Sequence, residues 1–284
     1  MKTLKDADPL LRLREVIAAN GSMLVAFSGG VDSTLLLRVA HDVLHDRAAG
    51  LLAVSESLPA SERAEAEELA ARIGCRLHIV ESHEMADPRY RSNPENRCYF
   101  CKSELFTLLH QEALRLGFDT LAYGANLDDQ GDYRPGMLAA GEHGVVAPLV
   151  EAGLGKTEIR LLARDLGLPN WDKPARACLS SRIPHGIEVT PERLAAIEKA
   201  EAGLYGLGFR QVRVRWHEQI ARIEIADEEI GRLADPQLRK RAAAVVRGAG
   251  FRFVTLDLEG YRQGSLNPSL LEIQRSGPAT EGGQ

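Results

Sequence analysis

The first part of the chain alternates short apolar runs with longer amphipathic segments. Five apolar runs predict buried strands, at residues 23–27, 51–54, 77–80, 120–123 and 145–149. Segments with apolar residues at helical spacing predict helices between or after them, at residues 34–40, 61–73, 104–116 and 157–166. Strands that alternate with helices predict an α/β fold with a parallel sheet covered on both faces.

The pattern changes at residues 170–186, which contain two prolines and little periodicity and predict an active-site loop. A helix that starts at Pro191 follows, then alternating strands at 211–216 and 220–225, a helix at 238–246 and a strand at 251–256. This order predicts a smaller α+β domain. We therefore expect one domain at residues 1–175, a second at 176–275, and a disordered tail at 276–284.

Composition excludes some classes of function. The 284 residues carry a net charge of −5, whereas nucleic-acid binders usually have a strong basic excess. No apolar run approaches the ~20 residues of a membrane span, and the N-terminus has no signal-peptide core. We therefore expect a cytoplasmic protein that binds neither nucleic acid nor membrane.

The polar loop after the first strand is typical of a phosphate site. Ser28, Gly29 and Gly30 interrupt the apolar run, and Asp32, Ser33 and Thr34 then begin a helix. Adjacent glycines let a backbone approach an anion closely, and the start of a helix favours a phosphate. Asp32 could hold Mg²⁺ that bridges phosphate oxygens. A glycine turn with a helix cap and no ligand is the alternative, but strand, turn, helix and polar side chains all agree with ATP binding.

This loop resembles the Ser-Gly-Gly-x-Asp-Ser loop of the PP-loop ATP pyrophosphatases and lacks the Gly-Lys-Thr ending of a Walker loop. That family transfers AMP to a carboxylate or carbonyl oxygen and releases pyrophosphate. The resemblance therefore implies that ATP is cleaved at its α-phosphate.

Three of the four cysteines form a candidate metal or redox site. Cys98 and Cys101 have C-x-x-C spacing, and Cys178 follows in the active-site loop. Three thiolates can bind a 4Fe-4S cluster and leave one iron open. Zinc with His185 as fourth ligand, a redox pair and a purely structural role are the alternatives. Cys75, at a helix-to-strand turn, is assigned to packing.

Further polar residues suit ATP or an anionic substrate. Asn126, Asp129 and Asp132 follow a predicted strand and could bind magnesium or position ATP, while Arg134 suits a phosphate or carboxylate. A surface loop is the alternative. Lys156, at a helix start, is expected to point toward the phosphates.

Two arginines share one face of a predicted strand. Arg213 and Arg215 suit a substrate phosphate or carboxylate, and pairing with Glu224 across the hairpin is an equal alternative.

Together these motifs resemble the LarE family, PP-loop sulfur transferases that mature the nickel-pincer nucleotide cofactor of lactate racemase. The resemblance covers residues 24–267 and includes Cys-Leu-Ser-Ser-Arg-Ile-Pro-His-Gly and Val-Arg-Val-Arg-Trp-His. It implies that ATP activates carboxylates of pyridinium-3,5-biscarboxylic acid mononucleotide, which then become thiocarboxylates. The cysteine trio resembles that of the members that bind a 4Fe-4S cluster. Other members sacrifice one cysteine.

The resemblance also implies residue roles. The loop from Ser28 to Thr34 would bind ATP and magnesium, and Arg182, Arg213 and Arg215 would face the substrate. Glu201 and Glu224 match acidic positions that bind metal at an oligomer centre, although a third such position is Arg232 here. A homohexamer, and partnership with other enzymes of nickel-pincer biosynthesis, are expected on the same basis.

Three alternatives remain open. A tRNA-thiolating PP-loop enzyme would also combine a C-x-x-C pair with a third cysteine, but would need a basic RNA-binding face. Amidation with ammonia, as in NAD synthetase, gives the cysteines no task. A nucleotide sensor without catalysis would bind ATP and release no pyrophosphate.

Overall fold

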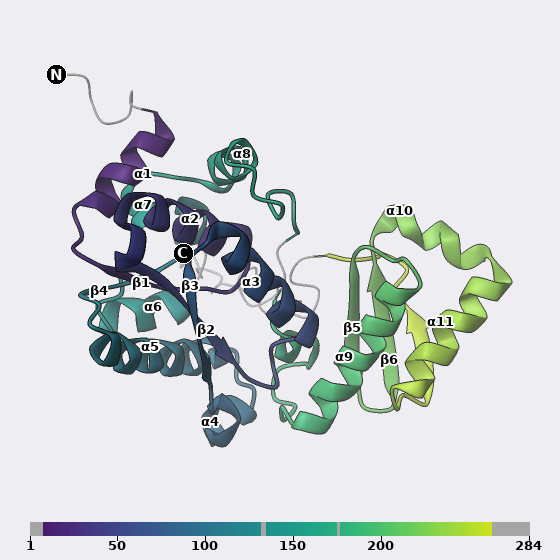
Figure 1. Ribbon diagram of the computed structural model, residues 1–284. Coiled ribbons are helices and arrows are strands. Elements are labelled where there is room, and N and C mark those ends of the chain that lie inside the picture. Colours follow the sequence, from purple (N-terminus) through teal and green to yellow (C-terminus); the bar gives the residue numbers. More distant parts are fainter. Residues whose placement is uncertain (1–7, 132–134, 175–176, 263–284) are drawn as a thin grey trace, which may run out of the picture. The chain divides into compact units, whose positions relative to one another are not determined.

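The computed structural model describes residues 8–131, 135–174 and 177–262 (Figure 1). Contacts divide the chain into two compact units, Met1–Cys178 (unit 1) and Leu179–Gln284 (unit 2). Arg134, Asp132 and the tail at 276–284 lie outside the described residues.

A four-stranded sheet forms the centre of unit 1. Its strands are β1 (Met23–Ala26), β2 (Ala48–Val54), β3 (Arg76–Glu81) and β4 (Thr120–Tyr123), in the order β3-β2-β1-β4. All neighbouring strands are parallel, which confirms the predicted α/β class. Strand β1 lies between β2 and β4, so its carboxyl end is at a point where the chain winds outward in both directions. Ligands bind at such points in open parallel sheets.

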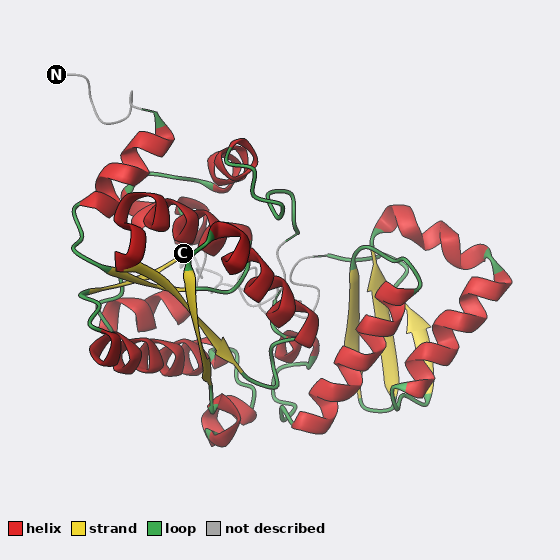
Figure 2. Ribbon diagram, in the orientation of Figure 1, coloured by secondary structure: helices red, strands yellow, loops and turns green. Residues whose placement is uncertain are grey.

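Helices cover both faces of this sheet (Figure 2). The helices of unit 1 are α1 (Pro9–Ala18), α2 (Val31–Leu44), α3 (Ala60–Ile73), α4 (Pro88–Arg91), α5 (Arg97–Leu116), α6 (Pro135–Glu142), α7 (Pro148–Glu151) and α8 (Lys156–Asp165). Short 3₁₀ turns connect them: η2 (His45–Arg47), η3 (Glu84–Ala86) and η4 (Leu127–Gly131).

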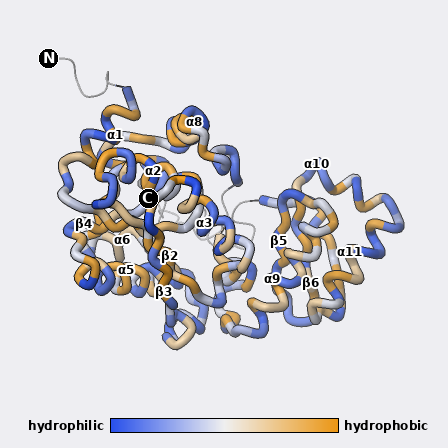
Figure 3. Tube along the Cα trace, viewed as in Figure 1, coloured by the Kyte–Doolittle hydropathy of each residue, from blue (hydrophilic) through white to orange (hydrophobic). Residues whose placement is uncertain are grey.

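Alternation along β1 divides the core into two clusters. Met23 and Val25 pack with residues of α1, α2, α3, α7 and α8, whereas Leu24 and Ala26 pack with residues of α5 and α6. Successive strand side chains point to opposite faces, so both faces of β1 are buried and the strand is apolar throughout. The neighbouring strand β2 is also largely apolar (Figure 3). The burial of β1 anchors the polar loop that follows it.

Two predicted elements differ from the structure. The run at 145–149 forms only an isolated bridge from Val146 to Ala122, and α7 begins at Pro148. Proline suits the first turn of a helix, so it ends the extended segment there. Helix α5 begins at Arg97 instead of residue 104, so Cys98 and Cys101 lie in its first two turns.

Unit 2 contains a three-stranded sheet and packed helices. It runs η5 (Leu179–Arg182), α9 (Pro191–Gly206), β5 (Val212–His217), β6 (Ile220–Ile225), α10 (Asp227–Ile230), η6 (Gly231–Ala234), α11 (Pro236–Gly248) and β7 (Phe253–Leu256). Strands β5 and β6 are antiparallel, and β7 pairs with β6 in parallel. This order agrees with the expected α+β arrangement.

Candidate active site

The loop after β1 presents backbone N–H groups at the carboxyl edge of the unit 1 sheet. Gly29 has a φ of +70°, a left-handed conformation that suits glycine. Ser33 Oγ and Thr34 Oγ1 donate to the Gly30 carbonyl over 3.1 and 2.8 Å. Among the described residues, the N–H groups of Gly29, Val31 and Asp32 have no hydrogen-bond partner. Unpaired donors at a helix N-terminus can bind an anion such as phosphate.

Gly124 lets β4 approach this loop closely. A Cβ at Gly124 would lie 2.8 Å from Ser33 N and 3.1 Å from the Asp32 carbonyl carbon. Both neighbours are backbone atoms, so they cannot move aside as a flexible side chain would. The missing side chain therefore brings the segment after β4 next to the start of α2.

A charged contact lies beside the loop. Lys156 Nζ donates to Asp32 Oδ2 over 2.5 Å. The other Asp32 oxygen, Oδ1, is buried and has no hydrogen-bond partner among the described residues. An orphaned carboxylate oxygen at a phosphate loop fits a Mg²⁺ ligand, since that ion prefers oxygen donors.

The segment after β4 holds Lys156 in place. The Lys156 N–H donates to Asp128 Oδ2 over 2.6 Å, and the Asp128 N–H donates to Asn126 Oδ1 over 3.0 Å. Asp129 Oδ2 accepts from the Asn126 N–H over 3.1 Å. The structure therefore brings Asn126, Asp129 and Lys156 to the same edge as the loop, but Asn126 and Asp129 have local hydrogen bonds as well.

The three cysteines lie near one another in unit 1. Desolvation and the neighbouring Cys178 raise the pKa of Cys98. Desolvation, followed by Glu84, raises the pKa of Cys101 well above its usual value. The buried guanidinium of Arg97 interacts with all three thiols and donates to Asn93 Oδ1 over 2.5 Å. One buried cation therefore interacts electrostatically with each of the three thiols.

Glu84 connects the cysteines to the end of β2. Its carboxylate interacts with Cys101, and its Oε1 accepts from Ser55 Oγ over 2.8 Å and from Ser57 Oγ over 2.5 Å. Ser55 directly follows β2, the neighbour of β1. Because carboxyl ends of parallel strands meet at one sheet edge, the thiols and the phosphate loop belong to the same edge.

The donor chemistry of the thiols fits an iron–sulfur cluster or another thiophilic metal. Within residues 8–131, 135–174 and 177–262, however, no group of three His, Cys, Asp or Glu side chains is placed closely enough to hold a metal ion.

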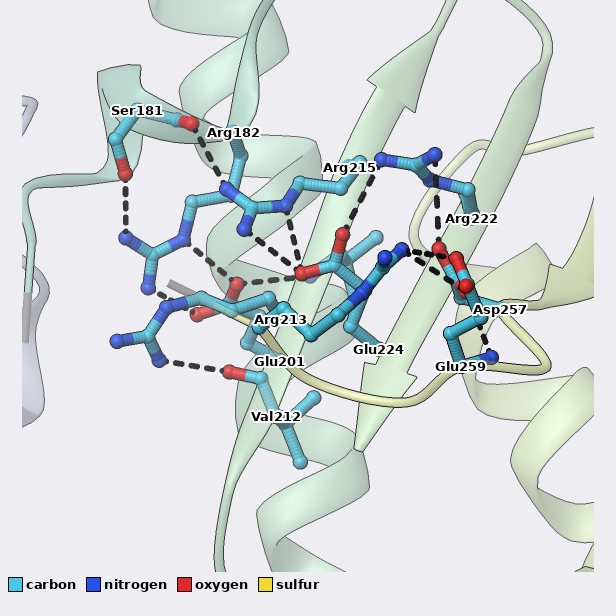
Figure 4. Close-up of polar contacts among 12 residues, drawn as sticks. Ser181, Arg182, Glu201, Val212, Arg213, Arg215, Arg222, Glu224, Asp257 and Glu259 are labelled. Carbon is cyan, nitrogen blue, oxygen red and sulfur yellow. Dashed lines mark hydrogen bonds and ion pairs between the residues drawn. The ribbon is translucent and has the colours of Figure 1, made fainter. Parts of the chain in front are cut away.

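Unit 2 contains a buried network of arginines and acids (Figure 4). Arg182 donates from Nε and Nη2 to the two oxygens of Glu201, over 2.9 and 3.0 Å. Arg215 donates from Nε and Nη2 to Glu224 Oε2, over 2.9 and 2.7 Å. Glu224 is 0% exposed and also accepts from Arg222 over 3.2 Å. Of the two alternatives for Arg215, the structure therefore contains the pairing with Glu224.

Arg213 differs from its two neighbours in this network. Its Nη1 donates to the Val212 carbonyl over 2.8 Å, and its guanidinium lies 5.3 Å from the centre of the Tyr261 ring. Burial, followed by nearby Arg182, lowers its pKa. Nearby Glu201 acts in the opposite direction and raises this pKa, and an anionic substrate group would stabilise the buried cation further. Arg213 therefore remains a candidate for a substrate phosphate or carboxylate.

The two glutamates have arginine partners where a metal was expected. Glu201 Oε1 also accepts from the Val214 N–H over 2.9 Å. A metal at Glu201 or Glu224 would compete with these contacts. The oligomer-centre metal remains a prediction, as does a substrate role for Arg182 and Arg215.

Comparison with known proteins identifies the family. The chain is 38% identical to the pyridinium-3,5-bisthiocarboxylic acid mononucleotide synthase of Lactiplantibacillus plantarum, over 88% of this chain and 90% of that protein. The chain belongs to the LarE family. It is also 47% identical to an uncharacterized protein of Synechocystis sp., over 91% of this chain and 96% of that protein. No protein-family model matches the sequence.

More distant similarity supports the fold of unit 1. The chain is 26% identical to one component of the glutamine-hydrolyzing GMP synthase of Methanocaldococcus jannaschii, over 52% of this chain and 50% of that protein. Together with the parallel sheet, this confirms the PP-loop fold. As a LarE-family protein the chain is an enzyme of the sulfurtransferase class with an ATP-using PP-loop domain. No helix among the described residues is long and apolar enough to cross a membrane.

Sequence reasoning missed three residues of the candidate site: Gly124, Asp128 and Asn170. Gly124 and Asp128 lie in the segment after β4 that also contains the predicted residues Asn126 and Asp129. A glycine directly after a strand could have indicated the close approach at Gly124. Asn170 donates from Nδ2 to the Gly29 carbonyl and to Thr34 Oγ1. Its sequence neighbours show no pattern that would have indicated these contacts.

Proposed function

We propose that this chain converts carboxylates of pyridinium-3,5-biscarboxylic acid mononucleotide to thiocarboxylates, at the expense of ATP. The observation that carries the proposal is the placement of the phosphate loop and the cysteines at one sheet edge. The identity to a synthase named for the bisthiocarboxylic acid product supports the choice of substrate.

The proposed reaction has two steps for each carboxylate. A substrate carboxylate oxygen attacks the α-phosphorus of ATP, pyrophosphate leaves, and an acyl adenylate forms. A sulfur nucleophile then attacks the acyl carbon and AMP leaves with the oxygen, so the carbon retains sulfur. Loop N–H groups, Lys156 and Mg²⁺ at Asp32 would stabilise the phosphate charges. Arg213, with Arg134, Arg182 and Arg215, is proposed to face the anionic substrate.

We further propose that Cys98, Cys101 and Cys178 hold a 4Fe-4S cluster. Three thiolates leave one iron without a protein ligand, and the chemistry this group supplies when bound is delivery of an extra sulfide. The three-thiol set beside Arg97 supports the proposal, since a buried cation favours an anionic assembly. A homohexamer in the cytoplasm, working with other enzymes of nickel-pincer biosynthesis, completes the proposal.

The test uses the full-length protein under anaerobic conditions. We expect protein reconstituted with iron and sulfide to contain iron and acid-labile sulfide, and to lose most of both in C98A, C101A and C178A. C75A is the matched control, because Cys75 packs in the core cluster of β1 and α2. Unchanged iron content in the three variants would disprove the cluster.

Activity is tested by mass spectrometry after incubation with ATP, Mg²⁺ and the pyridinium mononucleotide. We expect AMP, pyrophosphate and a product in which sulfur replaces oxygen. An intact Cys178 after turnover would support sulfide delivery, whereas its loss of hydrogen sulfide would show that the cysteine is sacrificed. Thiolation of tRNA without conversion of the mononucleotide would favour the rival function.

A further inference from the structure

The peptide between Gly29 and Gly30 is held by a residue far away in the sequence. Asn170 Nδ2 donates to the Gly29 carbonyl over 3.0 Å and to Thr34 Oγ1 over 3.0 Å. Thr34 Oγ1 in turn donates to the Gly30 carbonyl over 2.8 Å. Asn170 is 7% exposed and Thr34 is 0% exposed, so these contacts are shielded from water.

These contacts set the direction of the loop N–H groups. In a planar trans peptide the C=O and N–H point in opposite directions. Holding the Gly29 carbonyl toward Asn170 therefore turns the Gly30 N–H to the opposite side, where it donates to Ser28 Oγ over 3.4 Å. In the same way, the hydrogen bond from Thr34 Oγ1 fixes the direction of the Gly30 carbonyl, so the Val31 N–H of the same peptide points to the side away from Thr34 Oγ1.

Without such a hold the peptide would be free to rotate. Glycine populates positive and negative φ about equally, so a peptide between two glycines has little intrinsic preference for one orientation. A rotated peptide would present its carbonyl oxygen to the anion, and that oxygen would repel phosphate. The adjacent glycines that allow close approach therefore create a need for an external restraint.

We propose that Asn170 is a positioning residue that locks the Gly29–Gly30 peptide so that its C=O points away from the phosphates of ATP. This inference rests on the proposed use of the loop for ATP. Asn170 acts through the loop backbone and Thr34, and does not itself contact the nucleotide.

The other end of the Asn170 amide supports a role beyond stability. Asn170 Oδ1 is buried and has no hydrogen-bond partner among the described residues. A buried acceptor without a partner destabilises a fold, so an apolar residue would be the more stable choice if packing alone mattered. The position therefore keeps an amide for its two donated hydrogen bonds.

The test compares ATP with adenosine, which lacks the phosphates. Calorimetric titration of full-length N170L and N170D should show ATP binding weakened on the order of 10- to 100-fold, as expected when two shielded hydrogen bonds are lost. Adenosine affinity should stay within about twofold of the wild type, since the lock acts only on phosphate contacts. N170S keeps one hydroxyl donor, so its ATP affinity should lie between that of the wild type and that of N170L.

The controls separate this inference from a general loss of structure. N20L removes an amide at the opposite edge of the sheet, where Asn20 Nδ2 donates to the Val16 carbonyl, and should leave both affinities unchanged. If N170L does not fold, as judged by circular dichroism, N170S and N170D carry the test. Equal weakening of ATP and adenosine, or ATP binding within about twofold of wild type, would overturn the proposal. A wild-type protein that binds no ATP would instead overturn the proposed function.

Discussion

The Lys156 ammonium group lies 2.5 Å from Asp32 Oδ2, across 124 positions of the sequence. This contact places one positive charge at the start of α2, next to the loop N–H groups. The cation neutralises Asp32 in the free protein and would face the phosphates when ATP is bound. Lys156 is therefore paired with the Asp32 carboxylate in the free protein, and we expect the nucleotide to be its second anionic partner.

Lys156 can be tested by removal of its charge. K156M should weaken ATP binding by about 10-fold or more, because a cation near transferring phosphates is lost. Calorimetry with ATP and Mg²⁺ measures this. K199M, on α9 of unit 2, is the matched control and should bind ATP normally. Normal ATP affinity in K156M would show that the lysine only pairs with Asp32.

Gly124 is expected to tolerate no side chain. G124A should lower the free energy of unfolding by about 1–3 kcal/mol and weaken ATP binding, because the new Cβ would press on backbone atoms of Asp32 and Ser33. Urea unfolding and ATP titration measure the two effects. G141A places a methyl group on α6 where no atom lies within 4 Å, and should be neutral or slightly stabilising. Wild-type stability in G124A would contradict the close approach.

The buried pair of Arg215 and Glu224 should be costly to break. E224Q should lower the free energy of unfolding by about 3–5 kcal/mol, since it leaves buried arginine charge uncompensated. Chemical denaturation of the full chain measures this loss. E68Q removes the exposed partner of Arg72 and should cost less than about 1 kcal/mol. Similar stability losses in the two variants would mean that Glu224 is not a buried partner.

Cys75 should give the protein a pH-dependent stability in the alkaline range. Burial raises the pKa of its thiol from 9.0 to about 11. The folded state therefore keeps a proton that the unfolded state releases, so this contribution is complete below pH 9 and is lost as pH rises toward 11. The difference in unfolding free energy between wild type and C75A, measured from about pH 8 to about pH 11, should change in that direction.

Alkylation gives a second measurement of the same thiol. Iodoacetamide reacts with the thiolate, and burial keeps the Cys75 thiol protonated and shielded in the folded protein. Modification of Cys75 should therefore be slow in the folded protein and rapid in urea. Peptide mapping distinguishes Cys75 from the other cysteines. Equal rates in both states would contradict its burial.

Local patterns predicted the parts of the fold that depend on local sequence. The strands at 120–123 and 220–225 have the predicted bounds, because apolar or alternating residues there are bounded by clear breaks. The prediction of a strand at 145–149 was wrong because a short apolar run does not distinguish strand from helix, and Pro148 starts a helix instead. Helices α1 and α6 were not predicted at all.

In the candidate site, too, the features encoded by contiguous residues could be predicted, whereas contacts between distant residues could not. The loop from Ser28 to Thr34 was recognisable because strand, glycines and helix start are contiguous. The contacts that shape it were not, since Gly124 and Asn170 reach it from distant segments. The arginines on β5 show a third case. Alternation predicted their strand face but left a substrate anion and Glu224 as equal alternatives for Arg215. The structure shows Arg215 paired with buried Glu224, and its substrate role stays a prediction.

The span of 141 residues between Gly29 and Asn170 has a consequence for synthesis of the chain. The loop leaves the ribosome long before the residue that restrains it. At about 5–20 residues per second, this interval is roughly 7–28 s. The nascent protein would therefore carry this loop without its restraint, and we expect it to bind nucleotide at full affinity only after Asn170 has emerged and unit 1 has folded.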